Sequence, residues 1–308
     1  MKNRQEMFMG ASRLSVQDLR GRVNGINFPS HPLTFPRSSI APMSPRRQSN
    51  LPVCAIVMVM PIRILNGFSK SLPWPPYRRI GAVCLLAETN DGLLLVDTGL
   101  GLHDYEQPTR MMRDFMTVMR AVRDPDLALV RQIARSGRDP GTVRHIVLSH
   151  LHLDHAGGLP DFPQAQVHVA RREYETLRHP RKLLEIAYNK ADFAHGPRWN
   201  LHDLRGETWY GFDAVRLPGI EPQVWLVPLP GHTSGHCGVA LQTETGWVFF
   251  CGDAAPVNLD FRFGPVALYR PTIGPHVPRL KAFAAAHPEV RLIAGHMFLD
   301  FFEKEGTK

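Results

Sequence analysis

Short apolar runs alternate with amphipathic stretches along the chain from about residue 51 onward. Short apolar runs bounded by turn residues predict β-strands, whereas longer stretches with a helical spacing of apolar positions predict helices. The expected strands are residues 51–60, 79–88, 93–96, 144–149, 166–170, 224–229, 237–243, 247–251 and 291–294. Helices are expected over 107–135, from about Arg171, over 182–193 and near 277–286.

The order of these elements indicates a layered α+β fold. Residues 79–88 and 93–96 flank Thr89-Asn90-Asp91-Gly92, whose residue types are typical of a hairpin turn. Further along the chain, strands and helices are interspersed. This mixture favours layered sheets with helices outside over a purely doubly wound parallel sheet.

Most of the net positive charge lies in the N-terminal segment. The formal net charge is +8, and residues 1–50 hold eight basic and two acidic residues, which leaves +2 for residues 51–308. The first segment is rich in Ser and Pro and has no sustained apolar period, so it cannot bury enough apolar surface to offset its conformational entropy. We therefore expect a disordered basic tail over 1–50 and one domain over 51–308, a size that a single domain can reach. A nucleic-acid- or lipid-binding arm is a weaker interpretation, because the basic residues are scattered.

The same region bears on cellular location. Arg46-Arg47 precede the apolar run 51–60, an arrangement similar to a twin-arginine export signal. The run is shorter than the roughly 20 residues that span a bilayer, and no small-residue cleavage site follows it. We expect a cytoplasmic protein without a membrane partner, with periplasmic export as the alternative. The four cysteines form no close pairs, which argues against a disulfide scaffold.

Candidate chemistry gathers where the apolar runs end. Five runs end on a histidine or an aspartate: Asp97, His150, His232, Asp253 and His296. In the densest segment, His150 and His152 are two apart and can point the same way in an extended chain. Asp154 and His155 lie just beyond them and can face a second ion. Imidazole and carboxylate ligands suit zinc, although iron, manganese and cobalt also accept them.

The His150-Leu151-His152-Leu153-Asp154-His155 string, with Gly231-His232, Gly252-Asp253 and Gly295-His296, resembles the metallo-β-lactamase superfamily over roughly residues 60–300. The resemblance implies a four-layer αβ/βα sandwich with a dinuclear metal site at its edge. It implies a first metal held by His150, His152 and His232, a second held by Asp154, His155 and His296, and Asp253 as the bridge between them. Asp97 matches the aspartate of the family's strand-end DTG motif, which implies that it orients a ligating histidine.

Within this superfamily the chain is most similar to the N-acyl-homoserine lactonases. Asp97 and His150 are 53 residues apart, which leaves room for the helical insertion of that branch. The string Val167-His168-Val169 runs into Arg172-Glu173-Tyr174-Glu175, similar to its strand-then-helix. The small residue Ala254 follows the bridging aspartate, as in that branch.

One position departs from the lactonase pattern. The best-known lactonases have a tyrosine three residues after the bridging aspartate, placed to help the substrate carbonyl or leaving group, and this chain has Pro256. Tyr269 and Tyr188 are candidates for a substitute.

The expected function is a hydrolase that opens an ester or lactone bond. A hydroxide bridging two divalent ions, expected to be Zn²⁺, would attack the carbonyl. Asp154 is the candidate catalytic residue, because it could orient the nucleophile or pass its proton to the leaving group. The expected partner is a small-molecule ester or lactone, with a homodimer open. Nucleic acid is not expected, because residues 51–308 are nearly neutral.

Several alternatives remain open. A glutathione-thioester hydrolase, a phosphotriesterase or an iron-dependent sulfur dioxygenase would share the fold. A flavodiiron protein is disfavoured, because its pattern has a glutamate where this chain has His152. The Met-rich segment 107–120 could line an acyl-chain pocket or a dimer contact, or simply pack as a helix. Cys237 and Cys251 are interpreted as packed thiols.

Overall fold

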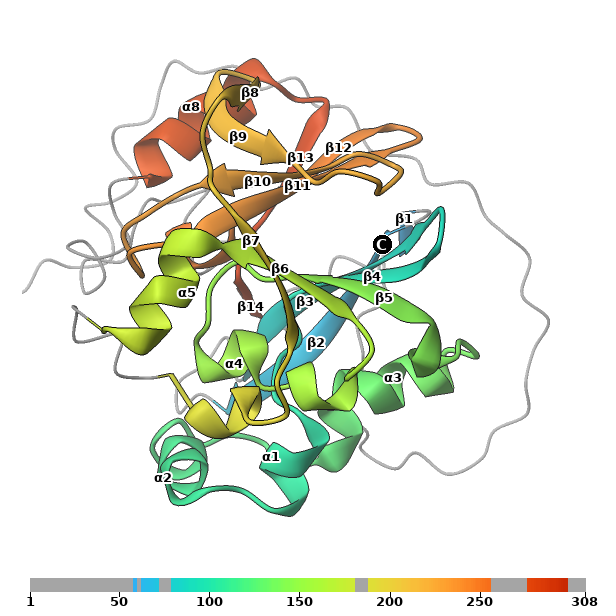
Figure 1. Ribbon diagram of the computed structural model, residues 1–308, viewed down its shortest axis with the longest axis vertical. Helices are drawn as coiled ribbons and strands as arrows, with labels where there is room; N and C mark the ends of the chain where they lie inside the picture. Colours follow the sequence, from blue (N-terminus) through green and yellow to red (C-terminus); the bar gives the residue numbers. More distant parts are fainter. Residues whose placement is uncertain (1–57, 60–61, 72–78, 181–187, 256–275, 299–308) are drawn as a thin grey trace, which may run out of the picture. The chain divides into compact units, whose positions relative to one another are not determined.

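The computed structural model describes residues 58–59, 62–71, 79–180, 188–255 and 276–298. Two mixed β-sheets face each other, and helices cover their outer faces (Figure 1). The expected tail over 1–50, most of the expected strand over 51–60, Pro256 and Tyr269 lie outside the described residues.

The first sheet has the order β1–β2–β3–β4–β5–β6–β7, and β14 pairs with β3. The hairpin β3–β4 is antiparallel, whereas β4, β5, β6 and β7 are parallel neighbours. The strands are β1 (Met58–Val59), β2 (Ile62–Ser71), β3 (Arg79–Thr89), β4 (Gly92–Val96), β5 (Val143–Val147), β6 (Gln166–Ala170), β7 (Arg198–His202) and β14 (His296–Phe298).

The second sheet has the order β13–β12–β11–β10–β9–β8. Its pairs are antiparallel except β12–β13, which is parallel. The strands are β8 (Glu207–Trp209), β9 (Phe212–Arg216), β10 (Val224–Pro228), β11 (Cys237–Thr243), β12 (Gly246–Phe250) and β13 (Val290–Ile293).

The helices are short and lie mainly outside the sheets (Figure 1). The α-helices are α1 (Leu102–Glu106), α2 (Arg110–Val118), α3 (Leu129–Arg135), α4 (Leu153–Ala156), α5 (Arg171–Arg178) and α8 (Val277–Ala286). The 3₁₀ turns are η2 (Pro125–Leu127), η3 (Pro140–Thr142), η4 (Leu159–Asp161), η6 (Lys190–Phe193) and η7 (Gly252–Ala254). Within the described part of the chain, no helix has the length and apolar character needed to cross a membrane.

Successive side chains of a strand point to opposite faces of its sheet, and this alternation produces the layers of the fold. Leu85 of β3 packs between the sheets with Leu226 and Val239 of the second sheet. Leu86, the next residue, points to the opposite face and packs in a cluster that includes Ile133 of α3. A third cluster joins the outer face of the second sheet to α8. The predicted four-layer sandwich is therefore confirmed.

The helix expected over 107–135 is wrong in its extent. The structure has two helices there, α2 and α3, separated by the turn η2. Arg120 adopts a left-handed conformation with φ of 51°, and Pro125 has no N–H to continue a helical ladder. Met112 and Met116 of α2 are buried in a small apolar cluster, which supports the packing interpretation for these two side chains.

Other differences concern strands with weak apolar patterns. β7, β8, β9 and β14 were not expected, and β2 starts after the run 51–60 in which a strand was expected. For the segment 182–193, the described part holds only the turn η6. Cys237 and Cys251 are buried free thiols, as interpreted from the sequence.

A ladder of three histidines crosses the parallel strands β5, β6 and β7. His145 Nδ1 is 3.1 Å from His168 Nε2, and His168 Nδ1 is 3.0 Å from His202 Nε2. Asp91 closes one end, with its carboxylate 3.1 Å from His145 Nε2. Burial, followed by the neighbouring imidazoles of His202 and His145, lowers the pKa of His168 to about 3. His168 is therefore neutral in the folded protein at neutral pH.

The low pKa of His168 predicts that the folded protein loses stability in acid. His168 in the unfolded chain has an ordinary pKa of about 6.5, so the unfolded chain takes up the proton first as the pH falls. The free energy of unfolding therefore decreases as the pH falls below about 6.5, and the loss amounts to roughly 2 kcal/mol at about pH 5. In urea unfolding with a chelator present, His168→Gln should show a flatter pH dependence than the parent protein. The exposed His179→Gln variant is the control, and identical slopes for all three proteins would contradict the prediction.

Candidate metal centre

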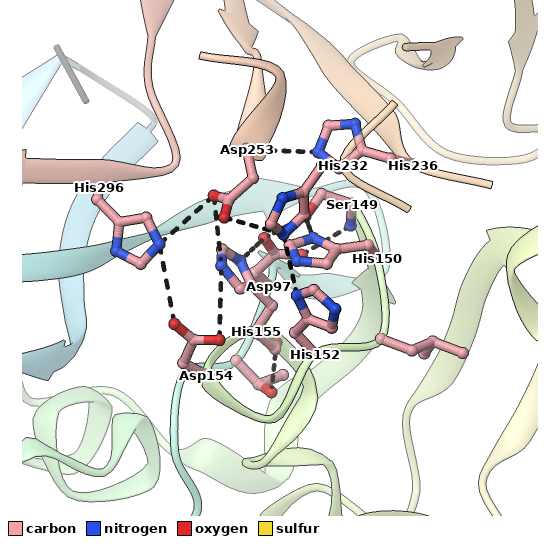
Figure 2. Close-up of polar contacts among 12 residues, drawn as sticks. Asp97, Ser149, His150, His152, Asp154, His155, His232, His236, Asp253 and His296 are labelled. Atoms are coloured by element: carbon pink, nitrogen blue, oxygen red, sulfur yellow. Dashed lines mark hydrogen bonds and ion pairs between the residues drawn. The ribbon is translucent and has the colours of Figure 1, made fainter. Parts of the chain in front are cut away.

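The predicted ligands come from loops at one edge of the two sheets (Figure 2). The first-sheet contribution follows β5, where the chain turns from an extended segment into α4. His232 and Asp253 follow β10 and β12 of the second sheet, and His296, which comes after β13, opens β14 of the first sheet. The structure brings together all eight predicted side chains: Asp97, His150, His152, Asp154, His155, His232, Asp253 and His296.

The ligand-type atoms form two groups. His150, His152 and His232 each offer a nitrogen, and these atoms lie within 4.8 Å of one another. Asp154, His155 and His296 form a second group with the same spread. The two groups match the two ligand sets that the resemblance implies.

Asp253 lies between the two groups (Figure 2). Its Oδ2 is 3.2 Å from His232 Nε2 in the first group. Its Oδ1 is 3.5 Å from His155 Nε2 and 3.4 Å from His296 Nε2 in the second. Each carboxylate oxygen therefore faces a different group, which is the arrangement needed for a bridging ligand.

Unpaired polar atoms in the site fit divalent cations. Among the described residues of the site, His150 Nε2, His155 Nε2 and Asp253 Oδ1 are buried and have no hydrogen-bond partner. Leaving such atoms unpaired costs about 1–3 kcal/mol each. Cations at the two ligand groups would supply partners to His150 Nε2, His155 Nε2 and Asp253 Oδ1, and a mixture of imidazole and carboxylate suits zinc and similar transition metals.

The histidines of the site differ in their protonation. Burial and neighbouring imidazoles lower the pKa of His150, and burial with His232 lowers that of His152 to about 4. Burial also opposes protonation of His155, but Asp253, Asp154 and Asp97 outweigh it and raise its pKa to about 10. The first group is therefore ready to ligate as neutral imidazoles, whereas a cation at the second group would displace a proton from His155.

Asp97 supports the ligands from behind. Its Oδ1 accepts a 2.7 Å hydrogen bond from the Ser149 amide, and its Oδ2 accepts bonds of 2.6 Å from Ser149 Oγ and 2.8 Å from His155 Nδ1. The bond to Nδ1 leaves Nε2 of His155 facing the centre. This arrangement matches the orienting role that the sequence implied.

Two glycines allow the second-sheet loops to approach so closely. Gly252 has a φ of 51°, a left-handed conformation that a side chain rarely adopts. A Cβ at Gly295 would lie 2.3 Å from Asp253 Oδ1. A side chain at either position would displace Asp253 or its neighbours.

Two supporting residues were missed by the sequence reasoning. His236 donates from Nδ1 to the Leu229 carbonyl (3.1 Å), and its Nε2 accepts the Asp253 amide N–H (3.0 Å). His236 thereby fixes the backbone of Asp253. Its only sequence signal is its position four residues after His232.

Glu173 of α5 is the second missed residue. Its buried carboxylate accepts hydrogen bonds from the Leu151 amide, the Thr233 hydroxyl and the Gly235 amide, at 3.0, 2.7 and 3.1 Å. It therefore ties the ligand loop of the first sheet to the loop that carries His232. Its only sequence signal is its place in the string Arg172-Glu173-Tyr174-Glu175, which resembles the strand-then-helix of the lactonases.

Tyr188, one of the two candidates for the missing tyrosine, lies beside the centre. Its ring centroid is 5.6 Å from that of His152. Its hydroxyl donates a 2.9 Å hydrogen bond to Glu173 Oε1. This bond directs the hydroxyl to the supporting carboxylate.

Asp97→Asn tests the support of His155. The asparagine amide cannot accept all three hydrogen bonds, so His155 loses its fixed orientation. We expect the affinity for zinc to fall about 10- to 100-fold, measured by competition with a chromophoric chelator. Asp91→Asn, at the far end of the histidine ladder, is the matched control. An unchanged affinity in Asp97→Asn would contradict this role.

Glu173→Gln tests the tie between the two ligand loops. The substitution replaces one carboxylate oxygen, an acceptor, by an amide NH₂ group, which is a donor. Buried N–H groups that donate to this oxygen then lose their partner. We expect the free energy of unfolding to fall by about 2 kcal/mol or more, measured by urea denaturation of metal-free protein. Glu175→Gln, exposed on the same helix, should leave stability nearly unchanged. Equal losses in the two variants would refute the assignment.

Known proteins share parts of this sequence. Residues 77–296 match the metallo-beta-lactamase superfamily. A probable metallo-hydrolase of Mycobacterium tuberculosis is 44% identical over 172 residues, which cover 55% of this chain and 55% of that protein. An N-acyl homoserine lactonase of Bacillus sp. is 30% identical over 181 residues, 58% of this chain and 65% of that protein. The matches thus span about half to two thirds of these relatives.

Solved structures share the fold. A B. thuringiensis AiiA variant with N-decanoyl-L-homoserine bound has a TM-score of 0.59 at 24% identity, over 80% of this chain and 95% of that one. AidC, a dizinc quorum-quenching lactonase, has a TM-score of 0.52 at 18% identity, over 77% and 87%. With the family match over residues 77–296, the conclusion is that this chain belongs to the metallo-β-lactamase superfamily.

Proposed function

We propose that this chain is a hydrolase that uses two divalent metal ions to open an ester or lactone bond. The single observation that carries the proposal is the position of Asp253, with one oxygen facing each of two three-residue ligand groups. The 30% identity to an N-acyl homoserine lactonase supports lactones as the substrate class. Zinc is proposed because the donor atoms are imidazole nitrogens and carboxylate oxygens.

We assign the described residues of the site to two cation positions. His150, His152 and His232 would hold one cation, and Asp154, His155 and His296 the other, with Asp253 between them. When bound, such cations acidify a water molecule and polarise a carbonyl oxygen. The side chains of His150 and His155 are fully buried. Asp154 and His296 are the more accessible members of the site, with side chains each 16% exposed.

Asp154 is the proposed catalytic residue. Its Oδ1 lies 3.9 Å from His155 Nε2, and its Oδ2 lies 3.8 Å from His296 Nε2. With one oxygen engaged as a ligand, the other can accept a proton from the attacking water and deliver it to the leaving alcohol. The Asp154 side chain is 16% exposed, so it is accessible from outside the site.

A hydrolysis panel on metal-loaded protein tests the proposal. It covers acyl-homoserine lactones, simple lactones, aryl esters, glutathione thioesters and phosphotriesters, with protein loaded separately with zinc, iron, manganese or cobalt. Lactones should be turned over fastest. Preference for thioesters or phosphotriesters would replace the proposed substrate class with those alternatives. Oxygen uptake by iron-loaded protein without hydrolysis would point to a sulfur dioxygenase.

Asp253→Ala tests the bridging role. Removing the shared carboxylate weakens both ligand groups at once, so metal content and turnover should fall together, with turnover down at least about 100-fold. Metal is measured by mass spectrometry after gel filtration, and Asp213→Ala on the exposed side of β9 serves as the control. Turnover retained in Asp253→Ala would contradict the bridging role.

A further inference from the structure

A second cluster of metal-ligand side chains lies outside the metal centre. His103 and Asp104 belong to α1, and Asp192 belongs to the turn η6, 88 residues further along the chain. His103 Nε2 is 3.2 Å from Asp104 Oδ1 and 3.3 Å from Asp192 Oδ1. One ligand-type atom from each residue lies within 4.8 Å of the other two. None of these residues belongs to the ligand pattern of the metal centre.

The two carboxylates are fully buried and incompletely paired. Asp104 and Asp192 are each 0% exposed. Asp104 Oδ2 accepts the Gly101 amide at 2.9 Å, and Asp192 Oδ1 accepts Asn189 Nδ2 at 2.7 Å. Asp104 Oδ1 and Asp192 Oδ2 are buried without a hydrogen-bond partner. Each aspartate therefore has one oxygen that accepts a hydrogen bond and one that accepts none, although Asp104 Oδ1 lies 3.2 Å from His103 Nε2.

The charges of this cluster do not balance within the protein. Two carboxylates face a single imidazole, so even a protonated His103 leaves one negative charge uncompensated. An unpaired buried charge costs several kcal/mol. Burial and Asp192 accordingly raise the pKa of Asp104 to about 7. A divalent cation would neutralise both carboxylates with His103 neutral, whereas without a cation the same balance needs a protonated His103 together with one proton shared by the two carboxylates.

We propose that His103, Asp104 and Asp192 bind a third divalent transition-metal ion, of the zinc or manganese type. One imidazole nitrogen with two carboxylate oxygens is a mixed ligand set that these ions accept, whereas magnesium prefers oxygen ligands alone. The proposal stands on this cluster and does not rest on the proposed hydrolase activity.

The position of the cluster indicates what this ion does. Asp104 Oδ2 packs against the end of α4, where a Cβ at Gly157 would lie 2.6 Å away. The ligands of the cluster join α1 to η6, and Asp104 also packs against the C-terminal end of α4, the helix that carries Asp154 and His155. An ion there cross-links α1 and η6, and none of its ligands is a candidate ligand of the metal centre. Its effect is structural: it stabilises the folded chain.

Metal counting separates this site from the metal centre. Zinc-loaded parent protein and variants are gel-filtered and their metal content is measured by mass spectrometry. Asp192→Asn should hold one zinc ion per chain fewer than the parent. The matched control Asp114→Asn, exposed on α2, should match the parent. Equal zinc content in Asp192→Asn and the parent would overturn the proposal.

A second measurement removes any dependence on the metal centre. In the Asp253→Ala background, added zinc should still raise the melting temperature, and His103→Gln in that background should abolish the rise. His103 has a partly exposed side chain, so its substitution is compatible with folding even if Asp192→Asn is not. A zinc-independent melting temperature in Asp253→Ala would mean that the cluster holds a shared proton, and the proposal would fail. Failure of the hydrolysis panel would leave both of these readouts unaffected.

Discussion

The arrangement of the candidate metal centre depends on the three hydrogen bonds that the buried carboxylate of Asp97 accepts. This carboxylate stands at the end of β4 and accepts hydrogen bonds from Ser149 and His155, which follow the neighbouring strand β5. Because β4 and β5 are parallel neighbours, the sheet itself determines where the ligand loop turns. The desolvation of this buried carboxylate is compensated by its three donors. The ligand geometry is thus set by two strands in addition to the loop between them.

The supporting residues act on the backbone as much as on the ligands. Glu173 accepts hydrogen bonds from backbone amides of both ligand loops, and His236 accepts one from the backbone amide of Asp253. Buried polar groups of this kind are costly unless they are satisfied, so they define one arrangement of the loops. The ligands are consequently preorganised before any cation arrives. The pKa of His155 is raised beside Asp253, so a cation bound there would displace a proton.

The sequence analysis singled out residues that the structure brings together, because five of them directly follow an apolar run: Asp97, His150, His232, Asp253 and His296. A strand end is visible in the pattern, and residue types such as those at His150 and Asp253 are informative there. His236 and Glu173 carry no such local signal, because their roles arise only from contacts across the fold. β7 and β8 were missed for a related reason: they are largely exposed or half-buried and lack an apolar run. The left-handed Arg120 likewise divides a helix without any distinctive residue type.

The crossing from β13 to β14 has a wider consequence. β13 lies in the second sheet and β14 in the first, and only Ala294 and Gly295 separate them. His296 therefore begins a strand of one sheet immediately after the chain leaves the other, beside Asp253. His150 and His155 follow a strand of the first sheet, whereas His232 and Asp253 follow strands of the second. The thickness of the core between the sheets therefore sets how far these two pairs of side chains lie from each other.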